Sequence, residues 1–295
     1  MSIPEARATE SLPAGLLFLR ALPMPRKLGI LERFYGKRLA CLGTATVVLA
    51  NGCVWTLDLS DVTHRWLVYG DYEGALQMSW LKQWLSCGGV FIDSGSNIGQ
   101  MVVSLAHLEG VQTLAFEPVS SERVWLQKCL KCYPSWPVTV FPLGLSDHKQ
   151  QLMIRLAGGR STLRTDWYLT QQLAEEPIEL VTLDSFSESQ GLNRIRLWKL
   201  DMEGHEVQAL SGAAKLLAAK RIDALLIEAQ TNTIPQLLDI LSSARYTLHV
   251  LDASGVLRAI TEASYPKNFN GNLIALPDEN TAADLVQRRG LFSIE

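Results

Sequence analysis

The sequence predicts an α/β fold built on a mostly parallel sheet, and one stretch near residue 90 provides the main observations. Val90, Phe91 and Ile92 form a short apolar run, which is typical of a parallel strand buried on both faces. Asp93 ends the run, a turn with two glycines follows, and residues 101–106 have a helical pattern. A strand, a glycine-bearing turn and a helix form the unit at which α/β folds bind nucleotide-like ligands. Further apolar runs alternate with helical patterns downstream, so we expect the same unit to repeat.

The composition is that of an ordinary globular protein with a large core, since 47% of the 295 residues are hydrophobic and 19% are charged. The net charge of −3 provides no basic field, so neither nucleic acid nor a membrane is expected as a partner. Five cysteines, an odd number, indicate a reducing compartment. Cys129 and Cys132 form the only C-x-x-C pair, and no nearby histidine completes a zinc site. No secretory signal and no apolar run of about 20 residues is apparent, so a cytoplasmic location is expected.

Residues 1–65 are predicted to form an N-terminal extension. Residues 14–22 and 28–36 have short helical patterns, and prolines between them prevent one continuous helix. Residues 44–50 and 53–59 are rich in β-formers and are joined by Asn51-Gly52, which predicts a hairpin.

Residues 66–280 are assigned to the main domain. Its first helix is expected at residues 75–86, where Trp80 and Trp84 lie one turn apart on a face that enters the core. Residues 281–295 are expected to form a peripheral polar segment.

The glycine-bearing turn indicates which ligand the first unit takes. A dinucleotide loop has three glycines, whereas only Gly95 and Gly99 are present here, and Asp93 opens the turn. Asp93 would repel a pyrophosphate by roughly 1 kcal/mol or more per close charge pair. S-adenosylmethionine (SAM) instead carries a sulfonium and an ammonium group, so the turn favours SAM over NAD. A purely structural turn and an NAD-dependent oxidoreductase are the alternatives at this point.

Two further acidic residues follow predicted strands. Glu117 comes after a strand at residues 113–116 and can accept hydrogen bonds from ribose hydroxyls, a role that serves NAD and SAM equally. A helix is expected at residues 121–132. Asp147 follows a third strand at residues 138–143, and it either accepts from the adenine amine or forms a turn.

Residues 150–184 interrupt the alternation of strands and helices. Residues 152–156 and 178–183 are predicted strands, and an insertion at the ligand edge of the sheet would be a natural substrate cover. An ordinary surface hairpin is the alternative.

The fourth core strand, residues 196–201, has an unusual composition. A buried parallel strand should be continuously apolar, yet Lys199 and Asp201 lie on one face near its carboxyl end, where ligands bind. A buried ion pair without a function would be costly, although a structural pair is the alternative. A helix to about residue 219 and a fifth strand at residues 224–228, ending in Glu228, are expected next.

The rest of the chain is predicted to add one helix and two late strands. The helix is expected at residues 233–244, and the strands are expected at residues 247–251 and 272–276.

The chain resembles the FkbM-type SAM-dependent methyltransferases over about residues 65–277. Six motifs carry the resemblance: Gly70-Asp71-Tyr72-Glu73, Asp93-x-Gly95-x-Asn97-Ile98-Gly99, Phe116-Glu117-Pro118, Leu183-Asp184, Lys199-Leu200-Asp201-Met202-Glu203-Gly204-His205-Glu206, and Ile227-Glu228. The resemblance implies a class I methyltransferase (Rossmann-like) fold with a seven-stranded, mostly parallel sheet and an antiparallel last strand. It also implies methylation of a hydroxyl oxygen on a small molecule, such as a sugar, a polyketide or another secondary metabolite.

The resemblance also assigns site residues. The methionine end of SAM would be held by the turn after the first strand, and the nucleoside by the later motifs. The implied cofactor-binding residues are Tyr72, Glu73, Asp93, Gly95, Ser96, Asn97, Gly99, Glu117, Pro118, Leu145, Asp147 and Asp201. The residues implied to border the methyl acceptor are Lys199, Asp201, Glu203 and His205. The family more often has an apolar residue at Ser94 and alanine at Ser96, and we expect the loop shape to survive both changes.

An alcohol nucleophile gains from a general base, and His205 has the most suitable ordinary pKa, near 6.5. Asp201 is the alternative base. Asp201, Glu203, His205 and Glu228 could be imagined as a cation site, but their spacing is not specific for a metal. We therefore expect no metal requirement. A SAM-binding partner protein without turnover is the rival from a different functional class.

Overall fold

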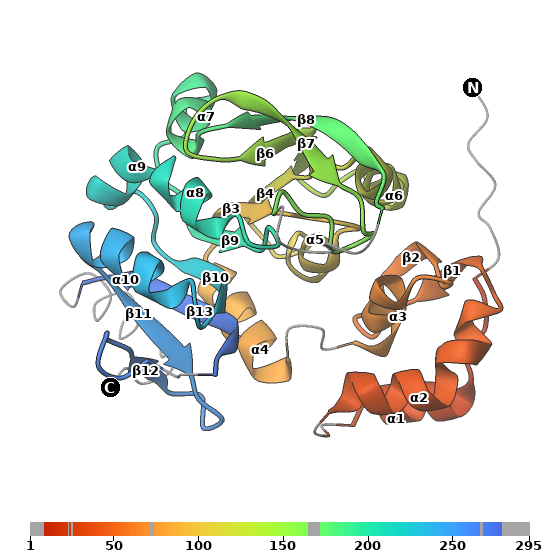
Figure 1. Cartoon of the computed structure of the whole chain (residues 1–295). Helices are drawn as coiled ribbons and strands as arrows, with labels where there is room; N and C mark the ends of the chain where they lie inside the picture. Colours follow the sequence, from red (N-terminus) through yellow and green to blue (C-terminus); the bar gives the residue numbers. More distant parts are fainter. Residues whose placement is uncertain are drawn as a thin grey trace.

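A central eight-stranded sheet organises the computed structural model, which describes residues 9–22, 24, 26–70, 74–164, 172–265 and 268–278 (Figure 1). The strand order is β12-β11-β13-β10-β9-β3-β4-β5. The strands are β3 (Gly89–Ser94), β4 (Val111–Phe116), β5 (Val138–Phe141), β9 (Leu197–Leu200), β10 (Leu225–Gln230), β11 (Tyr246–Leu251), β12 (Leu257–Ala259) and β13 (Asn270–Pro277).

The topology confirms a mostly parallel sheet with an antiparallel last strand. β5, β4, β3, β9 and β10 run parallel, and β13 inserts antiparallel between β10 and β11. The sheet has one strand more than the predicted seven, because β12 folds back antiparallel on β11. With three residues, β12 is too short to leave a pattern in the sequence.

Two predicted strands and one predicted helix have wrong boundaries. The strand expected at residues 138–143 divides at Pro142, which has no N–H to donate to a neighbouring strand. β8 (Glu175–Val181) stops before Leu183, where a new helix begins with the Thr182 side chain as its cap. The single helix expected to about residue 219 is two helices, because the backbone leaves the helical conformation at Ala213, where φ is −113° and ψ is 18°.

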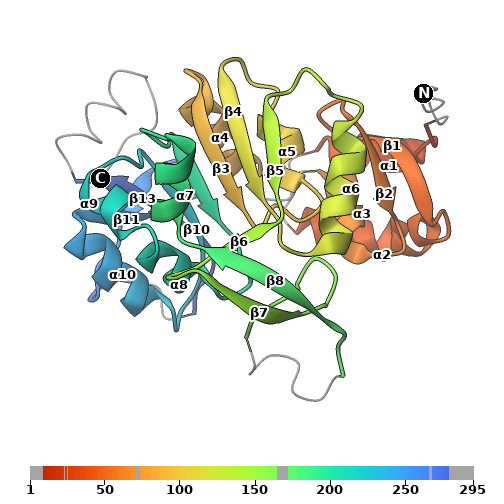
Figure 2. The ribbon, with the colours of Figure 1, turned by 90° about the horizontal axis from the view of Figure 1, so that it is seen from above.

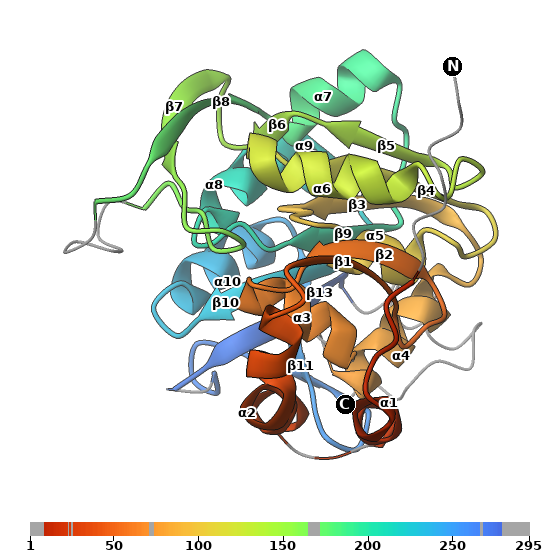
Figure 3. The same cartoon turned by 90° about the vertical axis from the view of Figure 1, so that its right-hand side faces the viewer.

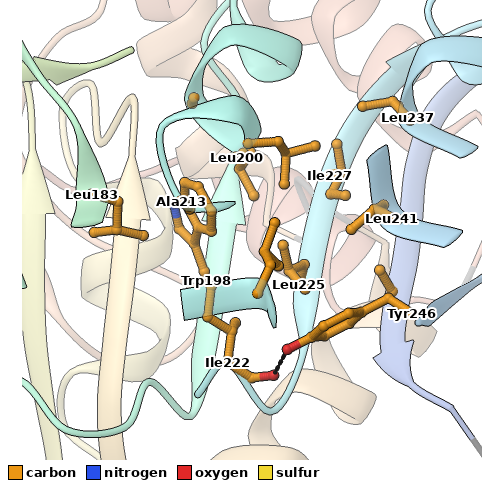
Figure 4. Close-up of a cluster of buried hydrophobic side chains, with 14 of the residues drawn as sticks. Leu183, Trp198, Leu200, Ala213, Ile222, Leu225, Ile227, Leu237, Leu241 and Tyr246 are labelled. Carbon is orange, nitrogen blue, oxygen red and sulfur yellow. Dashed lines mark hydrogen bonds between the residues drawn. The ribbon is translucent and has the colours of Figure 1, made fainter. Parts of the chain in front are cut away.

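Helices cover both faces of the sheet and bury two sets of apolar side chains. The helices of the main domain are α4 (Ala75–Leu85), α5 (Gln100–Leu105), α6 (Ser120–Leu130), α7 (Leu183–Gln190), α8 (Glu206–Ser211), α9 (Ala214–Ala218) and α10 (Ile234–Ser243). Figure 4 shows part of one face, where Trp198 and Leu225 pack with Leu241 of α10. The Tyr246 hydroxyl donates to the Ile222 carbonyl at 2.7 Å within this cluster. Trp80 and Trp84 stack in the core, as predicted, with ring centroids 5.2 Å apart.

The N-terminal extension contains α1 (Ala14–Arg20), α2 (Lys27–Ala40) and the predicted hairpin of β1 (Thr44–Val48) and β2 (Val54–Asp58), and α3 (Val62–Tyr69) crosses its expected boundary at residue 65. It shares a hydrophobic cluster with α5 and α6, and Figure 2 places β1 and β2 beside α6. The Trp55 indole donates to the Ile98 carbonyl at 3.1 Å, and the Asn51 amide donates to the Val103 carbonyl at 2.9 Å. The extension therefore supports the turn after β3. The C-terminal segment predicted at residues 281–295 lies outside the described residues.

The insertion forms a separate three-stranded sheet at one edge of the domain (Figure 2). β8 pairs antiparallel with β7 (Gln150–Arg155) and parallel with β6 (Leu143–Leu145). Ile154 of β7, with Ile178 and Leu180 of β8, packs against Val119 at the start of α6.

Candidate functional site

A cavity lies at the carboxyl ends of β3, β4, β9 and β10, and its outer wall comes from the insertion. Most of the predicted site residues line it: Asp93, Gly95, Ser96, Asn97, Glu117, Pro118, Leu145, Lys199, Asp201, Glu203 and His205. Gly99 and Asp147 are not among the lining residues, and Tyr72 and Glu73 lie outside the described residues.

The turns after β3 and β9 pack directly against each other at Gly95. Its φ is +75°, and a Cβ atom there would lie 1.8 Å from the Asp201 carbonyl oxygen, which no relaxation of a side chain can relieve. The Asp201 N–H also donates to the Ser94 carbonyl at 3.2 Å. Glycine is therefore required by a close approach of two backbones, and this approach forms the floor of the cavity.

The two serines that depart from the family pattern are both hydrogen-bonded. The Ser94 hydroxyl accepts from the Trp198 indole at 2.8 Å, and the Ser96 hydroxyl donates to the Asp93 carbonyl at 2.8 Å. Both serines are buried, so these bonds satisfy groups that would otherwise be costly to bury. The turn thus uses the extra hydroxyl groups internally.

Gly99 serves packing beneath the turn. Its φ is +93°, and a Cβ atom there would lie 2.6 Å from Leu126 and 3.0 Å from the Trp55 ring. The N-terminal extension therefore reaches the cofactor turn through Trp55, a contact that no local sequence pattern indicates.

Glu117 is buried at the end of β4 and holds the turn by its carboxylate. One oxygen accepts from the Asn97 N–H at 2.7 Å and the other from the Val119 N–H at 2.8 Å. Burial raises the pKa of Glu117 to about 8, in spite of these two hydrogen bonds. Each oxygen keeps a second lone pair, so the side chain can still accept from ribose hydroxyls.

One end of the cavity is apolar. Pro118 and Leu145, both predicted site residues, line it together with Ile154, Ile178 and Leu180 of the insertion. The insertion thus walls the apolar end of the cavity, and its predicted role as a substrate cover stays a prediction. Sequence reasoning missed these three residues because their strands are far from the site motifs in the chain.

A loop of the insertion crosses from this end to the polar end. The Asn97 side chain donates to the Gly159 carbonyl at 3.2 Å, and the Thr162 hydroxyl donates to the Glu203 carbonyl at 2.7 Å. The loop is therefore attached to both turns of the cavity floor.

At the polar end, Asp201 lies between two hydrogen-bond donors. The Lys199 ammonium donates to its carboxylate at 2.6 Å, and the carboxyl group of Glu228 also hydrogen-bonds to it. Burial by itself would raise the pKa of Asp201, but Lys199 brings it below its usual value. Burial and the neighbouring Asp201 raise the pKa of Glu228 to about 9. At neutral pH Asp201 is therefore ionised, and Glu228 carries the proton between the two carboxyl groups.

The turn after Asp201 has a second carboxylate with a shifted pKa. Glu203 has a left-handed backbone with φ of +52°, and burial, followed by Asp201, raises its pKa to about 7. Glu206, which sequence reasoning did not assign, accepts from the Met202 N–H at 2.8 Å and the Gly204 N–H at 3.2 Å. Glu206 therefore shapes the turn that presents Glu203.

His205 precedes α8 and is linked to Asp147 through one hydroxyl group. The Ser146 hydroxyl donates to Asp147 at 3.0 Å, and His205 Nε2 lies 3.0 Å from the same Ser146 oxygen. Because the single hydroxyl proton goes to Asp147, Nε2 is the donor to Ser146, and Nδ1 is left as a proton acceptor. Burial lowers the pKa of His205, so the ring is neutral at pH 7. Asp147 is exposed and also pairs with His148, so the structure does not place it at the adenine end.

Among the described residues, no group of three or more His, Cys, Asp or Glu side chains is arranged to hold a metal ion. None of the described helices is long and apolar enough to cross a membrane.

The sequence profile of the methyltransferase FkbM domain matches residues 93–248, which is more than half of the chain. The chain therefore belongs to the FkbM methyltransferase family: it is a methyltransferase, and its cofactor is SAM. This family excludes the NAD-dependent alternative. A comparison with curated protein sequences gives no match.

Three solved structures to which the chain is similar are distant from it in sequence. A SAM-dependent methyltransferase from Agrobacterium tumefaciens has 9% identity and a TM-score of 0.43, covering 80% of this chain and 71% of its own. A SAM-dependent O-methyltransferase from Thermotoga maritima has 13% identity and a TM-score of 0.38, covering 69% and 65%. TYW2 from M. jannaschii, in complex with AdoMet, has 11% identity and a TM-score of 0.37, covering 79% and 84%. The strand order and the family match, rather than these likenesses, define the fold.

Proposed function

We propose that this methyltransferase transfers the methyl group of SAM to a hydroxyl oxygen of a small polyhydroxylated molecule, such as a sugar or another secondary metabolite, in the cytoplasm. The observation that carries the proposal is the polar end of the cavity. A neutral His205 with an available Nδ1 and an ionised Asp201 line the same cavity as Gly95. This arrangement provides a proton acceptor and a hydrogen-bond acceptor, which is what an alcohol nucleophile needs.

The remaining lining residues fit the cofactor. Gly95 lets the two turns meet at the floor of the cavity, Asp93 and Asp201 place carboxyl groups beside it, and Glu117 presents two oxygens to a ribose diol. The apolar end accommodates the base. When bound there, SAM supplies a methyl group on a positively charged sulfur, which an oxygen nucleophile can take in one in-line displacement.

The chain's own residues would act on the acceptor hydroxyl. His205 Nδ1 takes the hydroxyl proton while Nε2 stays hydrogen-bonded to Ser146, so the ring does not turn as its charge changes. Asp201, held by Lys199, accepts a hydrogen bond from the acceptor and fixes its orientation. Orientation of this kind can contribute roughly 7–11 kcal/mol to lowering a barrier, and general-base catalysis about 10²–10⁴-fold.

The test is methyl transfer from isotopically labelled SAM to a panel of polyhydroxylated small molecules, with matched amines beside them. We expect mass gain on hydroxylated acceptors, and NMR should place the label on oxygen. Label on nitrogen would contradict the oxygen acceptor but not the methyltransferase. SAM binding by calorimetry with no transfer to any acceptor would favour the partner protein without turnover.

Metal removal gives a second check. Alkyl transfer from SAM needs no Lewis acid, and Lys199 already supplies a positive charge within the site. EDTA should therefore leave turnover unchanged. Loss of turnover that Mg²⁺ restores would show that the carboxylates at the polar end act as metal ligands.

A further inference from the structure

The N-terminal helices α1 and α2 expose an unusual number of large apolar side chains. Phe18 is 66% exposed and Phe34 is 72% exposed, values far above those of an ordinary core-facing helix. Leu17 of α1 and Ile30 of α2 are also exposed, and so is Leu22, which follows α1 by two residues. Isolated exposed apolar residues need no explanation, but four on two adjacent helices and a fifth just after α1 indicate a surface that contacts something else.

The two helices lie side by side at one end of the molecule, where Figure 3 shows both end-on. The Lys27 ammonium donates to the Arg20 carbonyl at 2.8 Å, and Gly15 lies against the Tyr35 hydroxyl. Leu16 and Leu31 point inward into one shared hydrophobic cluster. The opposite sides of both helices therefore face away from the body of the protein.

The charged residues on this outward side are all basic. On α2 and the residue before it, Arg26, Arg33, Lys37 and Arg38 are exposed, and Ile30 and Phe34 lie among them at helical spacing. No described residue forms an ion pair with any of these four cations. We call these four basic residues and the five exposed apolar residues the cationic-apolar patch.

The one acidic residue of this segment is turned inward. Glu32 accepts hydrogen bonds from the Arg65 guanidinium at 2.6 and 3.0 Å and from the Tyr69 hydroxyl at 2.7 Å. Residues 14–40 contain six basic residues and this single acid, a formal charge of +5. Because the whole chain carries −3, the remaining residues carry −8. The charges of the protein are therefore separated: α1 and α2 carry a net positive charge, and the remaining residues carry a net negative charge.

We propose that the cationic-apolar patch docks this methyltransferase on an anionic phospholipid surface. Helices that combine basic residues with exposed phenylalanine and leucine bind at the boundary between headgroups and acyl chains. The negative body is repelled by the same surface, so the charge separation also sets the orientation of the bound protein. The patch docks the protein peripherally, by helices that lie on the membrane. The expectation that no membrane is a partner came from the net charge of the chain, which averages over these two opposite regions.

The test is flotation of the purified full-length chain with vesicles of phosphatidylcholine, with and without phosphatidylserine, over a range of salt concentrations. We expect binding to the anionic vesicles only, weakening as salt rises. Each basic residue near an anionic membrane strengthens binding about fivefold, so the double variant Arg33→Gln/Lys37→Gln should bind about 25-fold more weakly. The variant Phe18→Ser/Phe34→Ser should also lose most of its binding, because insertion of the rings supplies the rest.

A matched control comes from α6, another exposed helix surface. The double variant Lys128→Gln/Lys131→Gln removes two exposed cations outside the patch and should bind vesicles like the wild type. SAM binding by calorimetry reports that every variant is folded, since no residue of the patch lines the cavity.

Four outcomes would overturn the proposal. The first is no enrichment on anionic vesicles at low salt, and the second is equal loss of binding in the α6 control. A third is a dimer in sedimentation velocity that Phe18→Ser/Phe34→Ser dissociates, which would make the patch an interface between copies of the chain. Retention on immobilised polyglutamate without vesicle binding would instead indicate an acidic protein as the partner.

Discussion

The two turns that form the floor of the cavity are built by different means. The turn after β3 is held by backbone geometry: Gly95 fits only without a side chain, and Glu117 accepts two backbone N–H groups. The turn after β9 is held by side chains that titrate, with Asp201 between Lys199 and Glu228. The difference indicates that cofactor binding depends on shape, whereas chemistry at the acceptor end depends on protonation. Substitutions in the two turns should therefore fail in distinguishable ways.

The largest effect is expected from Gly95→Ala in the first turn. A Cβ atom 1.8 Å from the Asp201 carbonyl must separate the two turns, so we expect SAM binding to be lost and the free energy of unfolding to fall by more than about 4 kcal/mol. Gly191→Ala is the matched control, because Gly191 also has a positive φ, +64°, but nothing lies near its Cβ position. Gly191→Ala should lower the free energy of unfolding by only about 1–2 kcal/mol and leave SAM binding intact. Urea unfolding and calorimetry measure both, and normal SAM affinity in Gly95→Ala would show that the two turns can separate without harm.

The next effect should appear in turnover alone. His205→Ala removes the proposed base but none of the contacts proposed for SAM, so turnover should fall about 10²-fold or more while SAM affinity stays within a few-fold. His148→Ala, which removes an exposed histidine paired with Asp147, is the control and should be near wild type. If His205→Ala keeps near-full turnover, His205 is structural, and Asp201→Asn becomes the variant to measure.

Glu117→Gln should weaken SAM binding, and this effect should be smaller than the loss of turnover in His205→Ala. The amide keeps the shape of the side chain but replaces one acceptor oxygen with a donor that faces a backbone N–H. SAM affinity should fall by about 1.5–3 kcal/mol, roughly 10- to 150-fold, because one acceptor for the ribose is lost and a buried backbone N–H is left facing another donor. Glu122→Gln changes another buried acid at the same cavity and should have little effect on affinity. Equal weakening in both variants would mean that net charge, rather than the position of Glu117, holds the ribose.

The two turns also differ in how much of each could be predicted from the sequence. The first turn was predicted because its evidence is local: an apolar run, an acid and two glycines within a few residues. Lys199 and Asp201 stood out for the same reason, as charges in a buried strand. The contacts that complete the site join distant residues, such as Trp55 with Ile98 and Ser146 with His205. The hydrophobic periodicity of the sequence does not indicate such pairs, because they depend on how the elements pack.

The position of the proton between Asp201 and Glu228 could not be predicted from the sequence either. Both carboxyl groups end predicted strands, and their neighbourhood follows from the pairing of β9 with β10. The sequence alone could not say which of the two is ionised, because that depends on burial and on the approach of Lys199. Asp147 is a related case: its place after the third strand predicted either a contact with adenine or a turn, and its side chain faces Ser146 and His148.

The smallest effect is expected from Glu203→Gln, and it should appear in how the free energy of unfolding depends on pH. The pKa of Glu203 is raised from its ordinary value of 4.5 to about 7, so between these values the folded chain keeps a proton that the unfolded chain has lost. The favourable contribution of this group is therefore complete below pH 4.5, and it is lost as pH rises toward 7. Glutamine cannot titrate, so the stability of Glu203→Gln relative to wild type should increase by about 1–3 kcal/mol from pH 4.5 to 7.5 and then level off. Urea unfolding across this range measures the difference. A Glu203→Gln curve parallel to wild type would mean that Glu203 titrates as an ordinary surface acid, and that the second turn is less dependent on protonation than its geometry indicates.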